Sequence, residues 1–174
     1  DWDLFDIPTY MKHTGPYLDK GLLSGWITAV RGCPFSCGYC SRSFGQKVTA
    51  RSENNMIDEI LEFKRLYNGS HFNIVDDLVM ARPKLVRAFA RSLIERNVNI
   101  TWQCTGRVNL VDEELFALMK KSGCTTLSYG IESGSQKILD NMNKGATVEQ
   151  AKRAIEITRK VGLNVGTPFM FGYV

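Results

Sequence analysis

Short runs rich in β-branched and aromatic residues alternate with longer segments in which apolar residues recur every three or four positions. The short runs predict five strands, because each is bounded by glycine or polar residues and is too brief for a stable helix. The expected strands cover residues 25–30, 71–75, 99–104, 125–130 and 163–172. Strands that alternate with helices favour a parallel sheet with right-handed crossovers, either an open doubly wound sheet or the arc of a barrel.

The helices between these strands carry recognisable start signals. One is predicted to start near Ser52, one at Pro83, one after Asp112 as N-cap, and one at the capping box Thr147–Gln150. A shorter helical stretch is expected around "SQKILDNM". This regular βα pattern predicts an α/β fold in one domain.

Composition and charge narrow the class of protein. The chain has 174 residues, of which 44% are hydrophobic, and its net charge of +4 comes from basic residues dispersed among acidic ones. The charge pattern therefore does not indicate nucleic-acid binding, because such binding needs a clustered basic face. An apolar run of membrane-spanning length and a signal peptide are both lacking, which predicts a cytoplasmic protein with reduced thiols. Residues 1–24 are expected to be a connector and residues 25–174 the core domain.

Three of the five cysteines fall in "RGCPFSCGYCSRS", spaced as Cys33-x3-Cys37-x2-Cys40. A structural zinc site needs four ligands, and a ferredoxin-type cluster run is closed by a further cysteine that is absent from this stretch. Cys104 and Cys124 lie in a predicted strand and after a helix end, so they are expected to pack as small buried side chains. Three thiolates favour an iron–sulfur cluster that keeps one iron open.

The residues around the cysteines suit such a cluster. Glycines allow the backbone to approach it closely, and Arg31 and Arg42 are expected to offset its negative charge. Tyr39, between the last two cysteines, is placed to stack on a flat ligand.

The cysteine spacing, with Tyr39 before the last cysteine, resembles the signature loop of the radical S-adenosylmethionine (radical SAM) enzymes. The resemblance implies a 4Fe–4S cluster held by Cys33, Cys37 and Cys40. It also implies that the open iron binds S-adenosylmethionine (SAM) and that reductive cleavage yields a 5′-deoxyadenosyl radical. An electron donor such as flavodoxin or ferredoxin and a small-molecule substrate follow from the same resemblance.

Two further segments match weaker motifs of the family, one of which holds the amino group of the methionine part of SAM. "IVDDLV" resembles the Gly-Gly-Glu motif by position and charge, although it lacks the glycines. There Asp76 and Asp77 would receive the amino group, with Asp77 in the place of the glutamate. In "TGRVN", Arg107 could pair with a carboxylate.

The last two segments resemble the motifs that contact the nucleoside. "YGIESGS" would place Glu132 and Ser133 on the ribose, and "FMFG" would place Met170 against the adenine. The cysteine loop, Asp77, Arg107 and Glu132 each follow a different predicted strand, and ligands bind at the carboxyl ends of parallel strands. This placement favours an incomplete parallel (β/α) barrel of the TIM type, with five of six βα units and the last strand expected beyond residue 174.

Within the family, "GIESGSQKILDNMNKG" resembles the branch that carries an upstream cobalamin-binding domain, which includes methyltransferases and oxidoreductases. The resemblance implies that cobalamin is a cofactor of a longer parent chain. Two alternatives stay open at this point: an iron–sulfur electron carrier that does not cleave SAM, and a zinc-stabilised interaction module.

Overall fold

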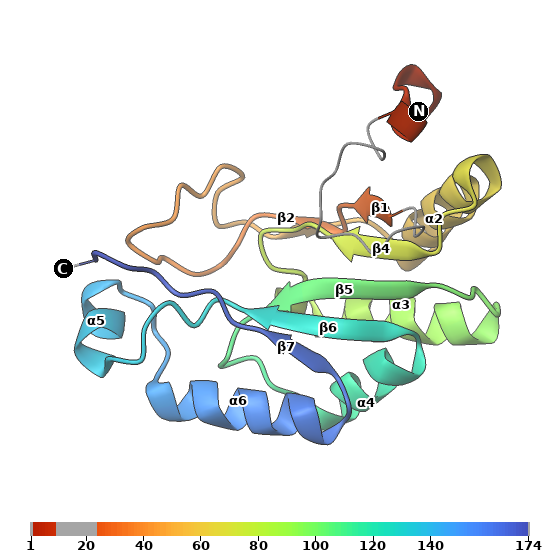
Figure 1. Ribbon diagram of the computed structural model, residues 1–174. Helices are drawn as coiled ribbons and strands as arrows, with labels where there is room; N and C mark the ends of the chain where they lie inside the picture. The colour runs from red at the N-terminus through yellow and green to blue at the C-terminus, as the bar shows by residue number, and fades with distance from the viewer. Residues whose placement is uncertain (1, 10–23, 174) are drawn as a thin grey trace.

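A five-stranded parallel sheet forms the centre of the protein in the computed structural model, which describes residues 2–9 and 24–173 (Figure 1). The strands lie in the order β1-β4-β5-β6-β7, so each new strand of the sheet is added at the same side. The elements of the βα units are β1 (Ser24–Ile27), α2 (Glu53–Tyr67), β4 (His71–Ile74), α3 (Pro83–Glu95), β5 (Thr101–Gly106), α4 (Glu113–Lys121), β6 (Cys124–Tyr129), α6 (Val148–Lys160) and β7 (Asn164–Gly166).

The helices α2, α3, α4 and α6 follow one another along one face of the sheet (Figure 1). A doubly wound sheet would carry helices on both faces, whereas a barrel arc carries them only outside. The observed arrangement is therefore the barrel arc, and the prediction of an α/β fold with an incomplete parallel barrel is confirmed. Smaller elements complete the chain: η1 (Trp2–Leu4), β2 (Val30–Arg31), β3 (Thr49–Ala50), η2 (Val79–Ala81) and α5 (Gln136–Asn141).

The core lies between the sheet and the helices. Alternate strand residues such as Phe72, Trp102 and Leu127 are fully buried there, and Phe89 packs edge-on against Trp102 with ring centroids 5.5 Å apart. Each such side chain stabilises the fold by about 1.5–3 kcal/mol. Cys104 and Cys124 are both buried in this core as free thiols, as the sequence predicted.

The predicted helix starts are confirmed. The side chain of Ser52 accepts a hydrogen bond from the Asn55 amide, Asp112 caps α4 in the same way, and Pro83 is the first residue of α3. The capping box at Thr147 is complete, since its side chain and that of Gln150 each accept a backbone N–H. These caps fix where each helix leaves the preceding loop.

Two strand predictions were too long. The first strand ends at Ile27 instead of Val30, because the chain then turns and Val30–Arg31 pairs antiparallel with Thr49–Ala50. The last ends at Gly166 instead of Gly172; Pro168 lacks an N–H for the ladder, and beyond it only Phe169 makes a parallel bridge, with Glu132.

Much of the predicted connector, residues 10–23, lies outside the described residues. Near the start of the chain, the Trp2 ring packs against Phe63 at 5.0 Å, and the Tyr67 hydroxyl donates to the Trp2 carbonyl. Within residues 2–9 and 24–173, none of the helices is long and apolar enough to cross a bilayer.

Candidate active site

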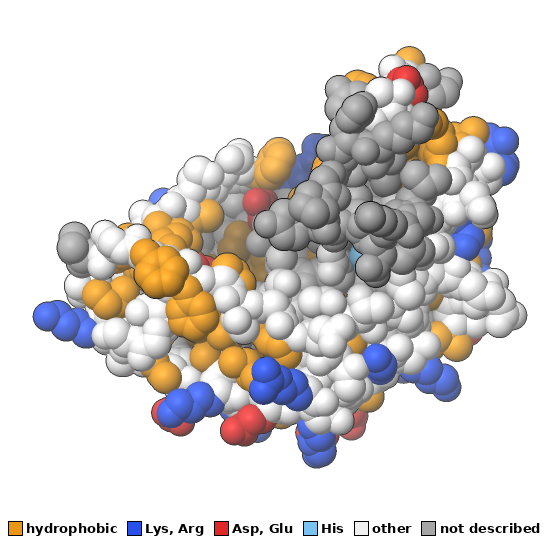
Figure 2. Space-filling view, in the orientation of Figure 1, with side chains coloured by type: hydrophobic (Ala, Val, Ile, Leu, Met, Phe, Trp, Pro, Cys, Tyr) orange, Lys and Arg blue, Asp and Glu red, His pale blue; other side chains and the backbone are white. Residues whose placement is uncertain are grey.

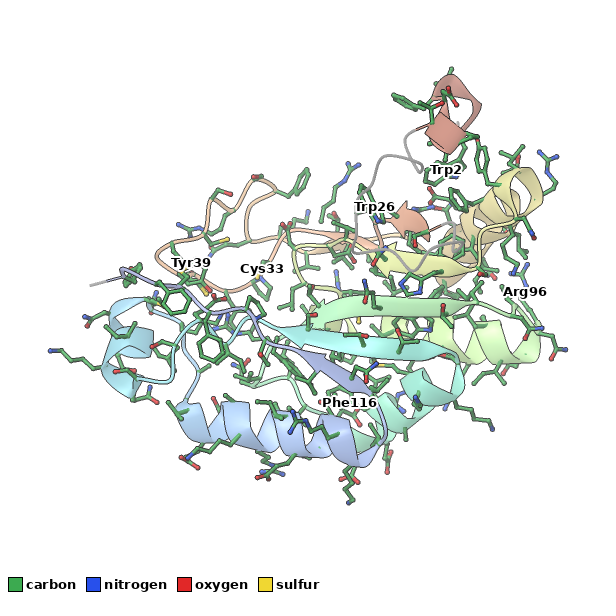
Figure 3. The ribbon with its side chains drawn as sticks, viewed as in Figure 1. Trp2, Trp26, Cys33, Tyr39, Arg96 and Phe116 are labelled. Atoms are coloured by element: carbon green, nitrogen blue, oxygen red, sulfur yellow. The ribbon has the colours of Figure 1, made fainter. Side chains whose placement is uncertain are left out.

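The three cysteines of the predicted cluster lie on one long loop between β2 and β3, at the end of the sheet where the strands terminate (Figure 3). Cys37 is buried, Cys33 is half-buried and Cys40 is exposed, and all three thiols are free. The Cys40 amide donates to the Cys37 carbonyl at 3.2 Å, which forms a turn between these two residues. The loop thus carries three free thiols that differ in exposure.

Backbone contacts anchor this loop on the segment after α5. The Gly38 amide donates to the Met142 carbonyl at 2.7 Å, and the Asn143 side chain donates to the Ser36 carbonyl at 2.8 Å. At its start the loop needs Gly32, whose φ is +89° and whose Cβ, if present, would overlap the Lys47 carbonyl. Contacts at the start of the loop and near its middle therefore define the course of its backbone.

Asp76 and Asp77, directly after β4, bind the backbone that leads into the loop. Asp76 accepts hydrogen bonds from the amides of Ala29 and Val30 at 2.8 and 3.0 Å, and Asp77 accepts one from Gly32 at 2.6 Å. Burial raises the pKa of Asp76 to about 6, against the lowering effect of the two amides. Both carboxylates thus position the cysteine loop, which is a role that sequence reasoning did not assign to them.

Glu132 lies at the centre of a buried polar triad. Its Oε1 accepts hydrogen bonds from the Tyr39 hydroxyl and from Lys144 Nζ, both at 3.0 Å, and Lys144 also donates to the Tyr39 oxygen at 2.6 Å. Burial, followed by the Glu132 carboxylate, raises the pKa of Tyr39. The triad joins the cysteine loop to the end of β6.

Lys144 is the residue of this triad that the sequence did not single out. It is only 5% exposed, and a lysine is almost never so buried unless it is paired. In the sequence it lies in "NMNKG", nine residues after Ser135, and nothing in this segment distinguishes it from an ordinary surface lysine. Glu132 itself has a φ of +66°, a conformation that costs free energy in a residue other than glycine and is common at functional sites.

Arg107, after β5, is buried beneath the loop. Its Nη1 lies 3.3 Å from Cys37 Sγ, and its guanidinium stacks on Phe35 at 3.8 Å from the ring centroid. Among the described residues its Nε has no hydrogen-bond partner, and no carboxylate forms an ion pair with it.

Ser133 and Met170 lie at the edge of this site. The Ser133 hydroxyl accepts a hydrogen bond from the Ser135 amide at 3.1 Å, and the Met170 amide donates to the Glu132 carbonyl at 2.8 Å. Met170 is thus in a loop beside Glu132 and not within a strand. Contacts from Asp77, Arg107 and Tyr39 link the ends of β4, β5 and β6 to the cysteine loop, so the predicted convergence of these segments is observed.

Three free thiols and one buried cation lie together at the cysteine loop. Across the described part of the chain, no three His, Cys, Asp or Glu side chains lie close enough together to hold one metal ion. Three free thiols on one glycine-containing loop, with the buried Arg107 cation against one of them, suit a larger anionic group.

An α/β barrel arc with such a loop at its carboxyl-terminal rim defines a class of cofactor-binding enzyme domains. The model of the radical SAM superfamily matches residues 27–173, which is most of the chain. The chain therefore belongs to the radical SAM superfamily, as its cysteine loop predicted. The 4Fe–4S cluster and SAM are the cofactors of that family.

Curated relatives support the same family. An uncharacterized methyltransferase of Pyrococcus horikoshii is 30% identical over 98% of this chain and 38% of its own length. The anaerobic magnesium-protoporphyrin IX monomethyl ester cyclase of Rubrivivax gelatinosus is 33% identical over 99% of this chain and 31% of its own. The chain thus spans about a third of the length of these relatives.

Solved structures share the fold. The cobalamin-dependent SAM radical enzyme OxsB superposes with a TM-score of 0.76 at 20% identity, over 83% of this chain and 23% of that one. The radical SAM methyltransferase TsrM from Kitasatospora setae, with cobalamin and a 4Fe–4S cluster bound, gives a TM-score of 0.76 at 18% identity, over 86% and 31% of the two chains. These two structures therefore share the fold of this chain.

Proposed function

We propose that this chain holds a 4Fe–4S cluster through Cys33, Cys37 and Cys40 and binds SAM at the open iron. When bound and reduced, such a cluster supplies the electron that cleaves SAM into methionine and a 5′-deoxyadenosyl radical. The observation that carries the proposal is the convergence of Arg107 and Glu132, from two different strand ends, on the loop with the three free thiols.

The chain's own residues would hold SAM around that iron. Asp77, with Asp76 beside it, accepts hydrogen bonds from the ammonium group, and Arg107 pairs with the carboxylate. Glu132 and Ser133 bind the ribose hydroxyls, Tyr39 and Met170 pack against the flat parts of the ligand, and the buried triad keeps Glu132 oriented.

We further propose that the radical serves cobalamin-dependent methyl transfer or a related oxidative modification of a small molecule in a longer parent protein. Support comes from the relatives, which include methyltransferases and cyclases, and from the cobalamin-dependent structural neighbours. A flavodoxin or ferredoxin would supply the electron. Lys and Arg side chains are scattered along the edge of the face seen in Figure 2 and do not gather into a patch, which gives a nucleic acid no continuous basic surface there.

Cysteine variants test how the cluster is held. After anaerobic reconstitution, Cys33→Ala, Cys37→Ala and Cys40→Ala should each lose most iron and sulfide. Cys104→Ala and Cys124→Ala are the matched controls and should retain both, because these thiols lie in the core away from the loop. Full iron content in any of the three loop variants contradicts the assignment.

The role of Asp77 needs a substitution that spares the loop. Asn keeps an oxygen that can accept the Gly32 N–H but removes the charge. Loss of a charge-assisted bond of about 1.5–3 kcal/mol should weaken SAM binding about ten- to hundredfold, with the cluster retained. SAM titrations followed by the electron paramagnetic resonance (EPR) signal of the reduced cluster measure this, with the surface variant Asp58→Asn as control. An unchanged SAM affinity in Asp77→Asn limits Asp77 to holding the loop.

The alternative function is an iron–sulfur electron carrier. It would load the same cluster and show the same loss in the cysteine variants, but SAM would not alter its EPR signal. Any change of that signal on addition of SAM excludes the carrier.

A further inference from the structure

The guanidinium of Arg107 is a buried cation for which the described protein offers no anionic carboxylate. The side chain belongs to a residue that is 6% exposed, and Nε is buried without a hydrogen-bond partner. Burial of an unpaired charge is costly, so a native structure that retains one has an anion nearby in its functional state. The candidate for that anion in the structure is the Cys37 thiolate, because Cys37 Sγ accepts a hydrogen bond from Arg107 Nη1.

The arginine cannot easily move away from this thiol. Its guanidinium is stacked on the Phe35 ring at 3.8 Å from the centroid, and Phe35 belongs to the same loop as Cys37. The loop in turn is tied to α5 through Gly38 and Met142. Rigid stacking and a low-dielectric environment both increase the effect of a charge on its neighbour.

We infer that Arg107 sets the reduction potential of the cluster by placing a buried positive charge and a hydrogen bond on the Cys37 thiolate. This inference rests on the proposed cluster and deepens it. A 4Fe–4S core held by three thiolates has a net charge of about −1, which becomes about −2 after one-electron reduction, so a fixed cation favours the reduced form.

Arg31 and Arg42 cannot provide the same effect. Both are exposed, and Arg31 lies over the Phe44 ring at 5.5 Å from its centroid. Water and salt screen an exposed charge strongly, whereas a buried one retains most of its field. The sequence predicted charge compensation by these two loop arginines, and we infer that Arg107 contributes more strongly because its charge is less screened.

Two substitutions separate charge from hydrogen bonding. Arg107→Gln keeps a donor and removes the charge, and Arg107→Lys keeps the charge and removes the planar stack. Arg96→Gln is the matched control, because Arg96 lies at the opposite end of the sheet in a surface pair with Asp58 (Figure 3).

The experiment is an anaerobic dithionite titration of the reconstituted protein without SAM, in which EPR measures the reduced cluster at each potential. Omitting SAM removes any effect of Arg107 on the SAM carboxylate. Arg107→Gln should shift the midpoint potential by at least about 59 mV to a more negative value. For a one-electron couple this shift equals a tenfold change in the equilibrium constant for reduction. Arg107→Lys should shift it less, and Arg96→Gln should leave it unchanged.

Each outcome decides the inference. An unchanged midpoint in Arg107→Gln, or equal shifts in the Gln and Lys variants, overturns it. If Arg107→Gln is folded by circular dichroism but retains no iron, retention of iron in Arg107→Lys supports a role for the charge, and loss in both overturns it. If the wild-type protein shows no EPR signal of a reduced cluster, the proposed function is overturned, and this inference with it. That outcome is distinguishable because the wild type and all variants then lack the signal.

Discussion

Replacement of Lys144 by Met tests whether Lys144 and Glu132 form a stabilising ion pair within the buried triad. Lys144 and Glu132 side chains are 6% and 12% exposed, with Nζ and Oε1 3.0 Å apart. Met has a similar length and no charge, so the variant leaves the Glu132 carboxylate buried with only the Tyr39 hydroxyl as partner. Removal of one partner of a buried pair costs about 3–5 kcal/mol of unfolding free energy.

The assay is urea unfolding of the cluster-free protein at pH 7, compared with the wild type. The double variant Lys144→Met/Glu132→Gln should recover most of the loss, because a neutral amide can still accept the Tyr39 hydrogen bond without a buried charge. Lys152→Met is the matched control: its pair with Glu149 is 63% and 78% exposed, so water screens it and the variant should unfold at nearly the same urea concentration as the wild type.

Two results would refute this reasoning. One is a Lys144→Met variant that is no less stable than Lys152→Met. The other is a double variant whose loss equals the sum of the two single losses, since additivity means that the two groups do not interact.

Two further predictions concern the start of the cysteine loop. Because the pKa of Asp76 is raised to about 6 from an ordinary value of 3.8, the folded state keeps this proton to higher pH, so wild-type stability relative to Asp76→Asn should fall as pH rises from about 4 to about 6. With discount for its partial exposure the fall is about 1–2 kcal/mol, and a rise over that range in urea titrations would contradict it. Gly32→Ala should cost more than about 2 kcal/mol and lower iron loading, since the new Cβ overlaps the Lys47 carbonyl. Gly45→Ala, with a φ of +71° but open space, should cost only about 1 kcal/mol in the same measurements; equal costs would mean that the overlap relaxes.

The sequence predicted the strand and helix order and most helix starts, because periodicity and caps such as Ser52 and Asp112 are local properties. It failed where long-range contacts override local ones. Val30 is a β-branched residue, the kind that favours strands. Its amide donates a hydrogen bond to Asp76, 46 residues away, and the chain leaves the five-stranded sheet before this residue. Only the folded structure reveals such a contact.

The same distinction applies to the site. The three cysteines are close in sequence, so their spacing alone predicted a cluster loop. Lys144 lies 105 residues from Tyr39 and 12 from Glu132, and only the tertiary fold makes it a buried partner of both. Arg107 was expected at the SAM carboxylate, and its contact with Cys37 Sγ, 70 residues away, could not be read from "TGRVN".

Hydrophobic side chains gather on the part of the surface that lies near α5 and the C-terminal segment (Figure 2). Phe169 and Phe171 are two exposed aromatic residues of the C-terminal segment. They lie on the segment that also carries Met170, beside Glu132. This part of the rim is therefore apolar next to the polar triad, as a nucleoside-binding site with a ring and a ribose requires.

The most direct test of the central claim is the product formed from SAM. The reconstituted protein, reduced with dithionite under anaerobic conditions, is incubated with SAM, and 5′-deoxyadenosine is quantified by chromatography. We expect 5′-deoxyadenosine and methionine to form in equal amounts, and neither to form in Cys37→Ala. A fully loaded and reduced cluster that yields no 5′-deoxyadenosine, while a known radical SAM enzyme yields it under the same conditions, would exclude SAM cleavage by this chain.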